Sequence, residues 1–93
     1  IPAEIAERIV LVAECVDDER TMDRALELGR ALAAGPRDAF LAVRQLVALA
    51  GSASLAEQLE HEAAAQGRLG DNADFAEGVA AFREKRPAQF GKR

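Results

Sequence analysis

A chain of 93 residues has room for one domain with a modest core. Its net charge of −4 argues against general binding to a nucleic-acid backbone, which needs a basic surface. Ala accounts for 21 residues, Trp and Tyr are absent, and four Phe provide all the aromatic bulk. Because Ala favours helices but buries little area, we expect an all-α fold whose thin core gains from a partner surface.

The first predicted elements are short. Residues 2–8 predict a helix, because Pro2 suits a first turn, where a backbone N–H has no helical partner. Residues 9–12 are four consecutive apolar residues of β-forming type, and they predict a short strand or an extended crossing. The only cysteine, Cys15, cannot form an internal disulfide, and its apolar and acidic neighbours favour a buried, unreactive thiol.

Four main helices are predicted to follow this short N-terminal element. Thr21 is the expected N-cap of the first, whose apolar positions keep the spacing of one helix face. Gly35 and Pro36 end it, Gly35 as a left-handed cap and Pro36 because it cannot continue the helix. Pro36 also opens the second helix, which closes at residues 51–52.

Capping boxes predict where the other two helices begin. Ser54-Leu55-Ala56-Glu57 has Ser and Glu at the spacing that satisfies two free amides reciprocally, and its helix stops around residues 67–70. Asp74-Phe75-Ala76-Glu77 imitates the same box and is expected to begin the last helix, which Pro87 ends.

Candidate groups for chemistry are few. His61 lies between two glutamates with Glu57 one turn earlier, but this set has too few ligands for a zinc site, so we expect no metal. No nucleophile stands near the histidine in sequence and no Gly-rich phosphate loop is present, so we assign no catalytic residue. No apolar stretch approaches the roughly 18–20 residues of a membrane span, which predicts no membrane contact and a cytoplasmic location.

The C-terminal end differs in charge from the rest. Residues 83–93 hold five basic side chains and one acid, Glu84, a balance of +4, so the preceding residues carry −8. Two interpretations stay open. One is a solvated end that pairs with the dipole of the last helix, and the other is a site for an anion such as a phosphorylated ligand.

A specific pattern covers the last helix. The positions Asp74…Glu77-Gly78…Ala81-Phe82…Glu84-Lys85-Arg86…Phe90, preceded by Leu59-Glu60-His61-Glu62, resemble the C-terminal signature of the enoyl-CoA hydratase/isomerase (crotonase) family. Residues 31–49 resemble that family's penultimate helices, and residues 3–16 resemble the element before them. Val10 departs from the family, which favours Gly there.

The resemblance implies that residues 1–93 are the single C-terminal helical, oligomerising region of a crotonase-like enzyme, with the N-terminal catalytic core absent from this chain. A chain that begins with Ile1 and not Met fits a piece of something longer. No catalytic residue carries over, because the family's Gly-rich oxyanion-hole motifs are not in this sequence.

Two site residues do carry over by motif. In family members whose last helix reads like this one, the Phe of the Ala-Phe pair and the Lys of Glu-Lys-Arg approach the adenosine end of coenzyme A, often in a neighbouring subunit. Here these are Phe82 and Lys85. The alternatives are ordinary core packing for Phe82 and a solvated surface position for Lys85.

The function implied by the resemblance is part of an enoyl-CoA hydratase/isomerase. Such a parent takes acyl-CoA thioesters as substrate without a tightly bound cofactor, and it forms homo-oligomers, as a trimer or a dimer of trimers. The alternative is a stand-alone, non-catalytic helical module for oligomerisation or interaction that kept the tail and lost the catalytic body.

Overall fold

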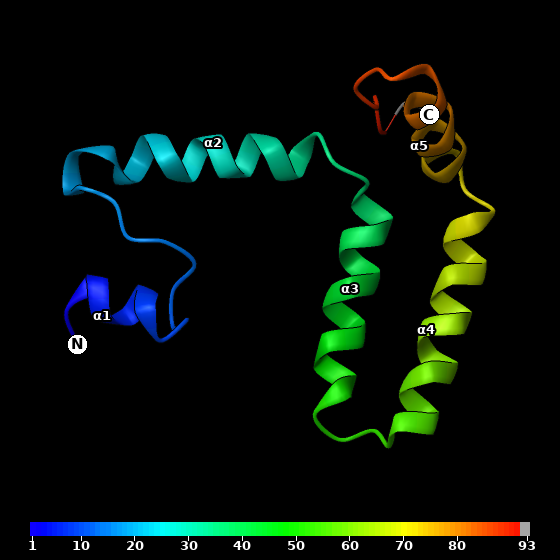
Figure 1. Cartoon of the computed structure of the whole chain (residues 1–93), viewed down its shortest axis with the longest axis horizontal. Helices are drawn as coiled ribbons and strands as arrows, with labels where there is room; N and C mark the ends of the chain where they lie inside the picture. Colours follow the sequence, from blue (N-terminus) through cyan, green and yellow to red (C-terminus); the bar gives the residue numbers. More distant parts are fainter. Residues whose placement is uncertain (92–93) are drawn as a thin grey trace. The chain divides into compact units, whose positions relative to one another are not determined.

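The computed structural model describes residues 1–91, and it divides into two compact units, residues 1–31 and residues from 32 onward (Figure 1). Every regular element of residues 1–91 is helical, in the order α1, a short 3-10 helix, α2, α3, α4 and α5. The prediction of an all-α fold with four main helices after a short N-terminal element is therefore confirmed.

In the first unit, helix α1 (Ala3–Arg8) follows Pro2 as expected, but residues 9–12 form no strand. Their amides end α1 instead: Val10 N–H donates to the Glu7 carbonyl (2.9 Å) and Leu11 N–H to the Ala6 carbonyl (2.8 Å). This pair of bonds is a Schellman ending, which requires a left-handed residue, and Val10 has φ of +60°. The prediction of a strand or extended crossing failed because the backbone N–H groups of these residues already cap α1, whatever the β propensity of their side chains.

Helix α2 (Thr21–Ala33) is preceded by the 3-10 helix Asp18–Arg20, so the chain is already helical before Thr21. The prediction of Thr21 as N-cap is wrong, because its backbone is in the right-handed helical region and its hydroxyl donates to the Asp17 carbonyl (3.4 Å). Gly35 follows the end of α2 without a positive φ, so it is not the left-handed cap that we expected. It is needed for another reason, since the ring of Phe40 occupies the place of a Cβ.

In the second unit, α3 (Arg37–Ala50) packs against α4 (Leu55–Gly70), and α4 packs against α5 (Ala73–Glu84). Pro36 stands directly before α3, and the capping box of α4 is confirmed. The Ser54 N–H donates to a Glu57 carboxylate oxygen (2.8 Å), and the Glu57 N–H donates to the Ser54 hydroxyl (3.3 Å).

The start of α5 differs from the predicted box at residues 74–77. Its N-cap is Asn72, whose Oδ1 accepts from the Phe75 N–H (2.8 Å). Asp74 lies inside the helix and accepts from the Gly91 N–H (2.9 Å) instead. The prediction failed because an Asx side chain two residues earlier already satisfies the free amide, which releases the Asp74 carboxylate for a bond distant in sequence.

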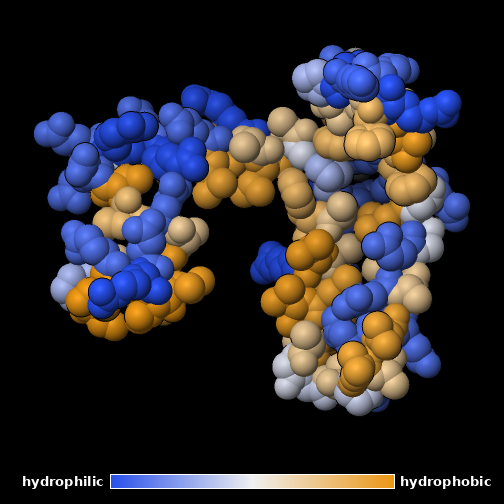
Figure 2. Space-filling model, in the orientation of Figure 1, coloured by the Kyte–Doolittle hydropathy of each residue, from blue (hydrophilic) through white to orange (hydrophobic). Residues whose placement is uncertain are grey.

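The core of the described residues is thin, as the composition led us to expect. Its buried residues are all alanines: Ala6, Ala42, Ala65 and Ala81. Large apolar side chains remain exposed on each unit, and Figure 2 shows apolar surface along the α3–α4 hairpin. On that hairpin Val47 and Leu55 are at least 70% exposed. Such a surface is typical of helices that pack against something further.

Candidate functional site

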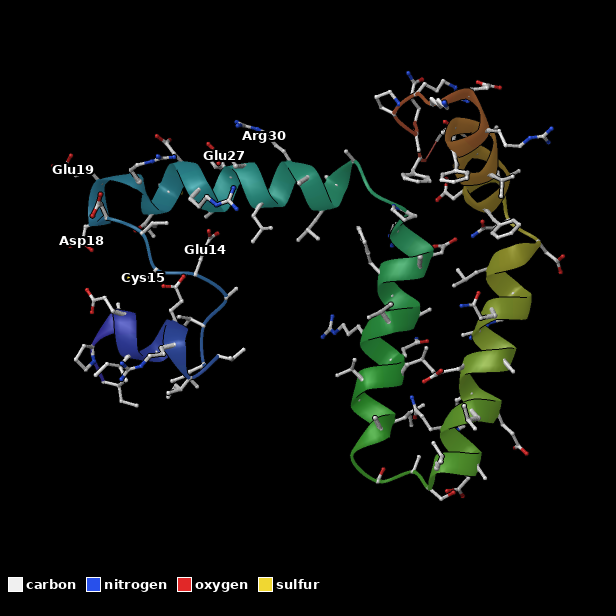
Figure 3. The ribbon with its side chains drawn as sticks, viewed as in Figure 1. Glu14, Cys15, Asp18, Glu19, Glu27 and Arg30 are labelled. Atoms are coloured by element: carbon white, nitrogen blue, oxygen red, sulfur yellow. The ribbon has the colours of Figure 1, made fainter. Side chains whose placement is uncertain are left out.

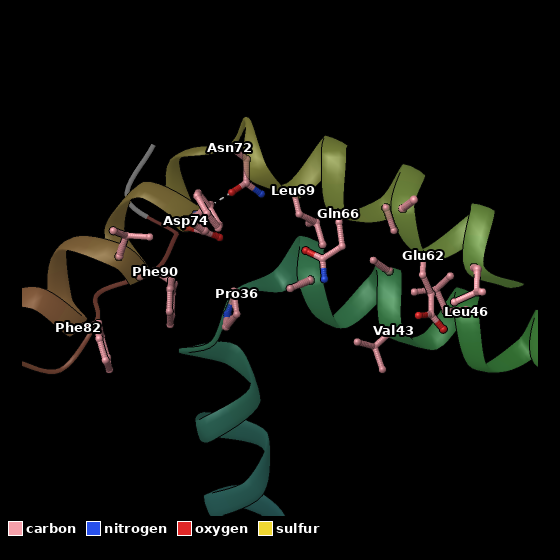
Figure 4. Close-up of a pocket in the computed structure, with 18 residues that line it drawn as sticks. Pro36, Val43, Leu46, Glu62, Gln66, Leu69, Asn72, Asp74, Phe82 and Phe90 are labelled. Carbon is pink, nitrogen blue, oxygen red and sulfur yellow. Dashed lines mark hydrogen bonds between the residues drawn. The ribbon is translucent and has the colours of Figure 1, made fainter.

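The second unit contains an apolar groove of about 830 Å³ between α3, α4, α5 and the C-terminal turn (Figure 4). Small residues of α3 and α4 line part of it, among them the buried Ala42 and Ala65. Larger apolar side chains line the rest: Val43, Leu46, Leu59, Leu69, Phe75, Val79, Phe82 and Phe90.

The polar groups at the end of the groove formed by α5 serve the fold. Asn72 caps α5 through the hydrogen bond drawn in Figure 4, and Asp74 holds the Gly91 amide. Phe90 lies beside Gly78, where a Cβ would be 3.7 Å from the Phe90 ring. The groove is therefore shaped by side chains that hold the C-terminal turn onto α5.

Helix α5 ends in a second Schellman motif, and this motif brings together the two predicted site residues. The Arg86 N–H donates to the Ala81 carbonyl (3.1 Å) and the Lys85 N–H donates to the Phe82 carbonyl (3.3 Å). Lys85 has φ of +53°, a conformation that Gly adopts far more easily than Lys. Phe82 is 86% exposed at the rim of the groove, so it does not pack into the core of its own unit.

A carboxylate–guanidinium cluster lies next to these two residues. Arg86 binds Glu77 through both terminal nitrogens (Nη1–Oε1 2.6 Å, Nη2–Oε2 3.1 Å) and binds Glu84 through Nε (2.6 Å). The hydrogen bonds of these carboxylates, Glu77 first, raise the pKa of Arg86 above its ordinary value. This cluster could not be found from the sequence, since Glu77 and Arg86 lie nine residues apart and meet only through the Schellman turn.

The cluster changes the picture of the basic C-terminal end. Arg86 is neutralised by its neighbours, and Lys92 and Arg93 lie outside the described residues. Within residues 83–91, Arg83 and Lys85 are the basic side chains for which the structure gives no carboxylate partner. Among these described residues, the charge of Arg86 is therefore paired within the chain, whereas the structure gives Arg83 and Lys85 no such carboxylate.

The first unit carries an acidic cluster around Cys15 (Figure 3). Glu14 forms an ion pair with Arg24 (2.8 Å), and Arg24 also binds Glu27 (3.0 Å). Burial above all, and then the nearby acids led by Glu4, raise the pKa of the Cys15 thiol. A raised pKa keeps the thiol protonated at neutral pH, which is the opposite of what a nucleophile needs.

Two features are absent from the part of the chain that the structure describes. Its histidines, cysteines and carboxylates, including His61, form no group of three or more that could hold a metal ion. Nor does it hold a helix with both the length and the apolar character required to cross a membrane.

Comparison with known proteins gives one consistent answer. A model of the enoyl-CoA hydratase/isomerase family matches residues 1–93. The chain is 44% identical over 90 residues to a probable enoyl-CoA hydratase of Rhodobacter capsulatus, and 37% identical over 90 residues to the 1,2-epoxyphenylacetyl-CoA isomerase of Escherichia coli K12. Each alignment covers 97% of this chain, and 35% and 34% of the respective relative.

A solved structure agrees. A Mycobacterium abscessus protein assigned as an enoyl-CoA hydratase/isomerase superposes on all of this chain with a TM-score of 0.94 at 39% identity, over 36% of its own length. The chain thus spans about a third of the length of the relatives that it matches. With the family model matched over every residue, the chain belongs to the enoyl-CoA hydratase/isomerase family.

Proposed function

We propose that this chain is the C-terminal part of an enzyme that acts on acyl-CoA thioesters, and that it contributes part of the coenzyme A site and a surface for subunit packing. The names of the two relatives both refer to CoA thioester chemistry. The catalytic groups of such an enzyme would lie outside these 93 residues, and acyl-CoA would be its substrate, with no tightly bound cofactor.

The observation that carries the coenzyme A role is the end of α5. Phe82 offers an exposed aromatic face, and Lys85 stands three residues later, where the chain turns away from the helix. An aromatic ring suits an adenine or pantetheine contact, and an ammonium group suits a phosphate. Backbone strain at an exposed residue supports a functional role for the side chain, because Gly would end the helix with less strain.

The packing role is supported by the groove and by the alanine core. A groove of about 830 Å³ lined by eight large apolar side chains is costly to leave in water. We propose that the rest of the enzyme and its neighbouring subunits cover this surface, in a trimer or a dimer of trimers. An isolated helical module would have to bury the same surface against another partner.

A chimeric enzyme tests this proposal. The chain replaces the matching 90 residues of the Rhodobacter capsulatus relative, and hydration of a short enoyl-CoA is measured. We expect turnover in the chimera and none from the 93-residue chain alone. A chimera that assembles but is inactive, or turnover by the chain alone, would contradict the proposal that this chain supplies part of the coenzyme A site while the catalytic groups lie outside it.

Point variants of the chimera test the coenzyme A contact. Lys85→Ala should raise KM for the enoyl-CoA about tenfold, the equivalent of one charge-assisted contact of about 1.4 kcal/mol, with kcat nearly unchanged. Phe82→Ala should act in the same direction. The controls are Arg68→Ala on α4 for loss of one exposed charge and Met22→Ala on α2 for loss of an exposed apolar side chain. Equal effects of variants and controls would refute the contact.

A further inference from the structure

Glu77 makes more contacts than a surface carboxylate needs. Its Oε1 accepts from Arg86 Nη1 (2.6 Å) and from the Gln89 N–H (2.7 Å), and its Oε2 accepts from Arg86 Nη2 (3.1 Å). Its side chain is 24% exposed, the lowest value among the carboxylates in the ion pairs of the described residues. One helical side chain therefore holds two separate points of the segment that follows α5.

These contacts involve residues that follow Lys85 closely in the chain. The residue after it, Arg86, is bound to α5 twice, by its N–H at the Ala81 carbonyl (3.1 Å) and by its guanidinium at Glu77. Glu77 and Ala81 are four residues apart, so they lie above one another on the same face of α5. The chain must reverse between Glu84 and Arg86 to make both contacts, and the left-handed φ of Lys85 produces this reversal.

The left-handed backbone is unfavourable for a lysine, so it persists only where surrounding contacts enforce it. Few apolar contacts are available to do so here, because residues 82–87 are all exposed. The bidentate Glu77–Arg86 pair and the Gln89 bond instead tie the segment to α5, and a charged partner makes such bonds stronger than neutral ones.

We infer that Glu77 is a positioning residue for the coenzyme A site: by holding Arg86 and Gln89 against α5 it keeps Lys85 in its left-handed conformation, with its ammonium group placed for a phosphate. This inference rests on the proposed function of Lys85. Glu77 itself does not touch the ligand, and a neutral side chain at this position leaves Lys85 charged but free to move.

The test uses the chimeric enzyme described above in four forms, namely with the chain unchanged, with Glu77→Gln, with Lys85→Ala and with both, and with Glu60→Gln on α4 as a matched control for loss of one exposed carboxylate. Amide hydrogen exchange reports the position of the segment. Binding of coenzyme A and of pantetheine, which lacks the phosphates, is followed by NMR titration. A general loss of stability would weaken the binding of both ligands alike, whereas a misplaced Lys85 would weaken the binding of coenzyme A alone.

We expect Glu77→Gln to speed exchange of the Arg86 and Gln89 amides about tenfold and to weaken coenzyme A three- to tenfold, with pantetheine and the Glu60→Gln control unchanged. The double variant should bind coenzyme A no more weakly than Lys85→Ala, because both changes remove the same contact. If Glu77→Gln leaves the ratio of coenzyme A to pantetheine affinity intact while Lys85→Ala lowers it, the positioning role is wrong. If Lys85→Ala leaves coenzyme A binding by the chimera unchanged, or the chimera does not bind coenzyme A, the proposed function is contradicted, and the positioning role with it.

Discussion

Val10→Gly is a direct test of how α1 ends. Val10 has φ of +60° and is 85% exposed, so its side chain has little packing to lose. The left-handed conformation costs an L-residue about 1–2 kcal/mol, and Gly avoids this cost. Gly also gains about 0.4–1 kcal/mol of chain entropy in the unfolded state, which acts in the opposite direction. The net expectation is a stabilisation of about 0.5–1 kcal/mol.

The Leu11 amide reports this change locally. It donates to the Ala6 carbonyl (2.8 Å) across the turn that Val10 makes, so its exchange requires α1 to open at this end. A stabilisation of about 0.5–1 kcal/mol should slow its exchange roughly two- to fivefold. The control is Val12→Gly, since Val12 is not among the described residues with a positive φ, and there the change should give equal or faster exchange.

An unchanged or faster Leu11 exchange in Val10→Gly would refute the reasoning, because it would mean that the left-handed turn carries no strain. The resemblance to the crotonase family predicts Gly at this position, and the φ of +60° is the backbone conformation that Val10 adopts in its place.

Three other predictions concern single contacts. The Ser54 N–H and hydroxyl lower the pKa of Glu57, so the capping box stabilises α4 fully at pH values above the ordinary Glu pKa, and this stabilisation is lost as the pH falls through the lowered pKa. Circular dichroism should show the loss of helix in acid. Ser54→Ala should cost about 1 kcal/mol at neutral pH and remove this acid transition. Gly35→Ala should destabilise the second unit by about 1 kcal/mol in urea unfolding, because its Cβ meets the Phe40 ring, and Phe40→Ala in the same chain should cancel most of that added cost. Cys15 should react with iodoacetamide at pH 7 more slowly than free cysteine, because its pKa is raised, and equal rates would contradict this.

Local chemistry explains which parts of the fold could be predicted from sequence. The Ser54–Glu57 box and the Pro36 start were correct, because each depends on residues within one turn of a helix. Thr21 and Asp74 were wrong as caps for the same type of reason, since a competing local structure, the 3-10 helix or Asn72, satisfied the amides first. Neighbouring residues compete to cap the same helix end, and the sequence shows the candidates but not which of them caps it.

The site divides in a similar way. Phe82 and Lys85 could be named from a motif, but α5 ends at Glu84, so the left-handed turn and not helix geometry places Lys85. Glu77, Arg86 and Gln89 could not be brought together from sequence alone. Their contact depends on a left-handed turn at a lysine, which no propensity favours, and on a carboxylate that reaches across that turn.

The helix contacts of the second unit have a kinetic consequence. Within the described residues, α3 packs on α4 and α4 on α5, so each of these contacts joins neighbours in the chain. Loops this short close rapidly, and a unit with such low contact order is expected to fold in microseconds to milliseconds. Burying the apolar groove against another surface is a bimolecular or interdomain step, and its rate depends on concentration or on the rest of the protein. Assembly, and not helix formation, should therefore be the slow event in maturation.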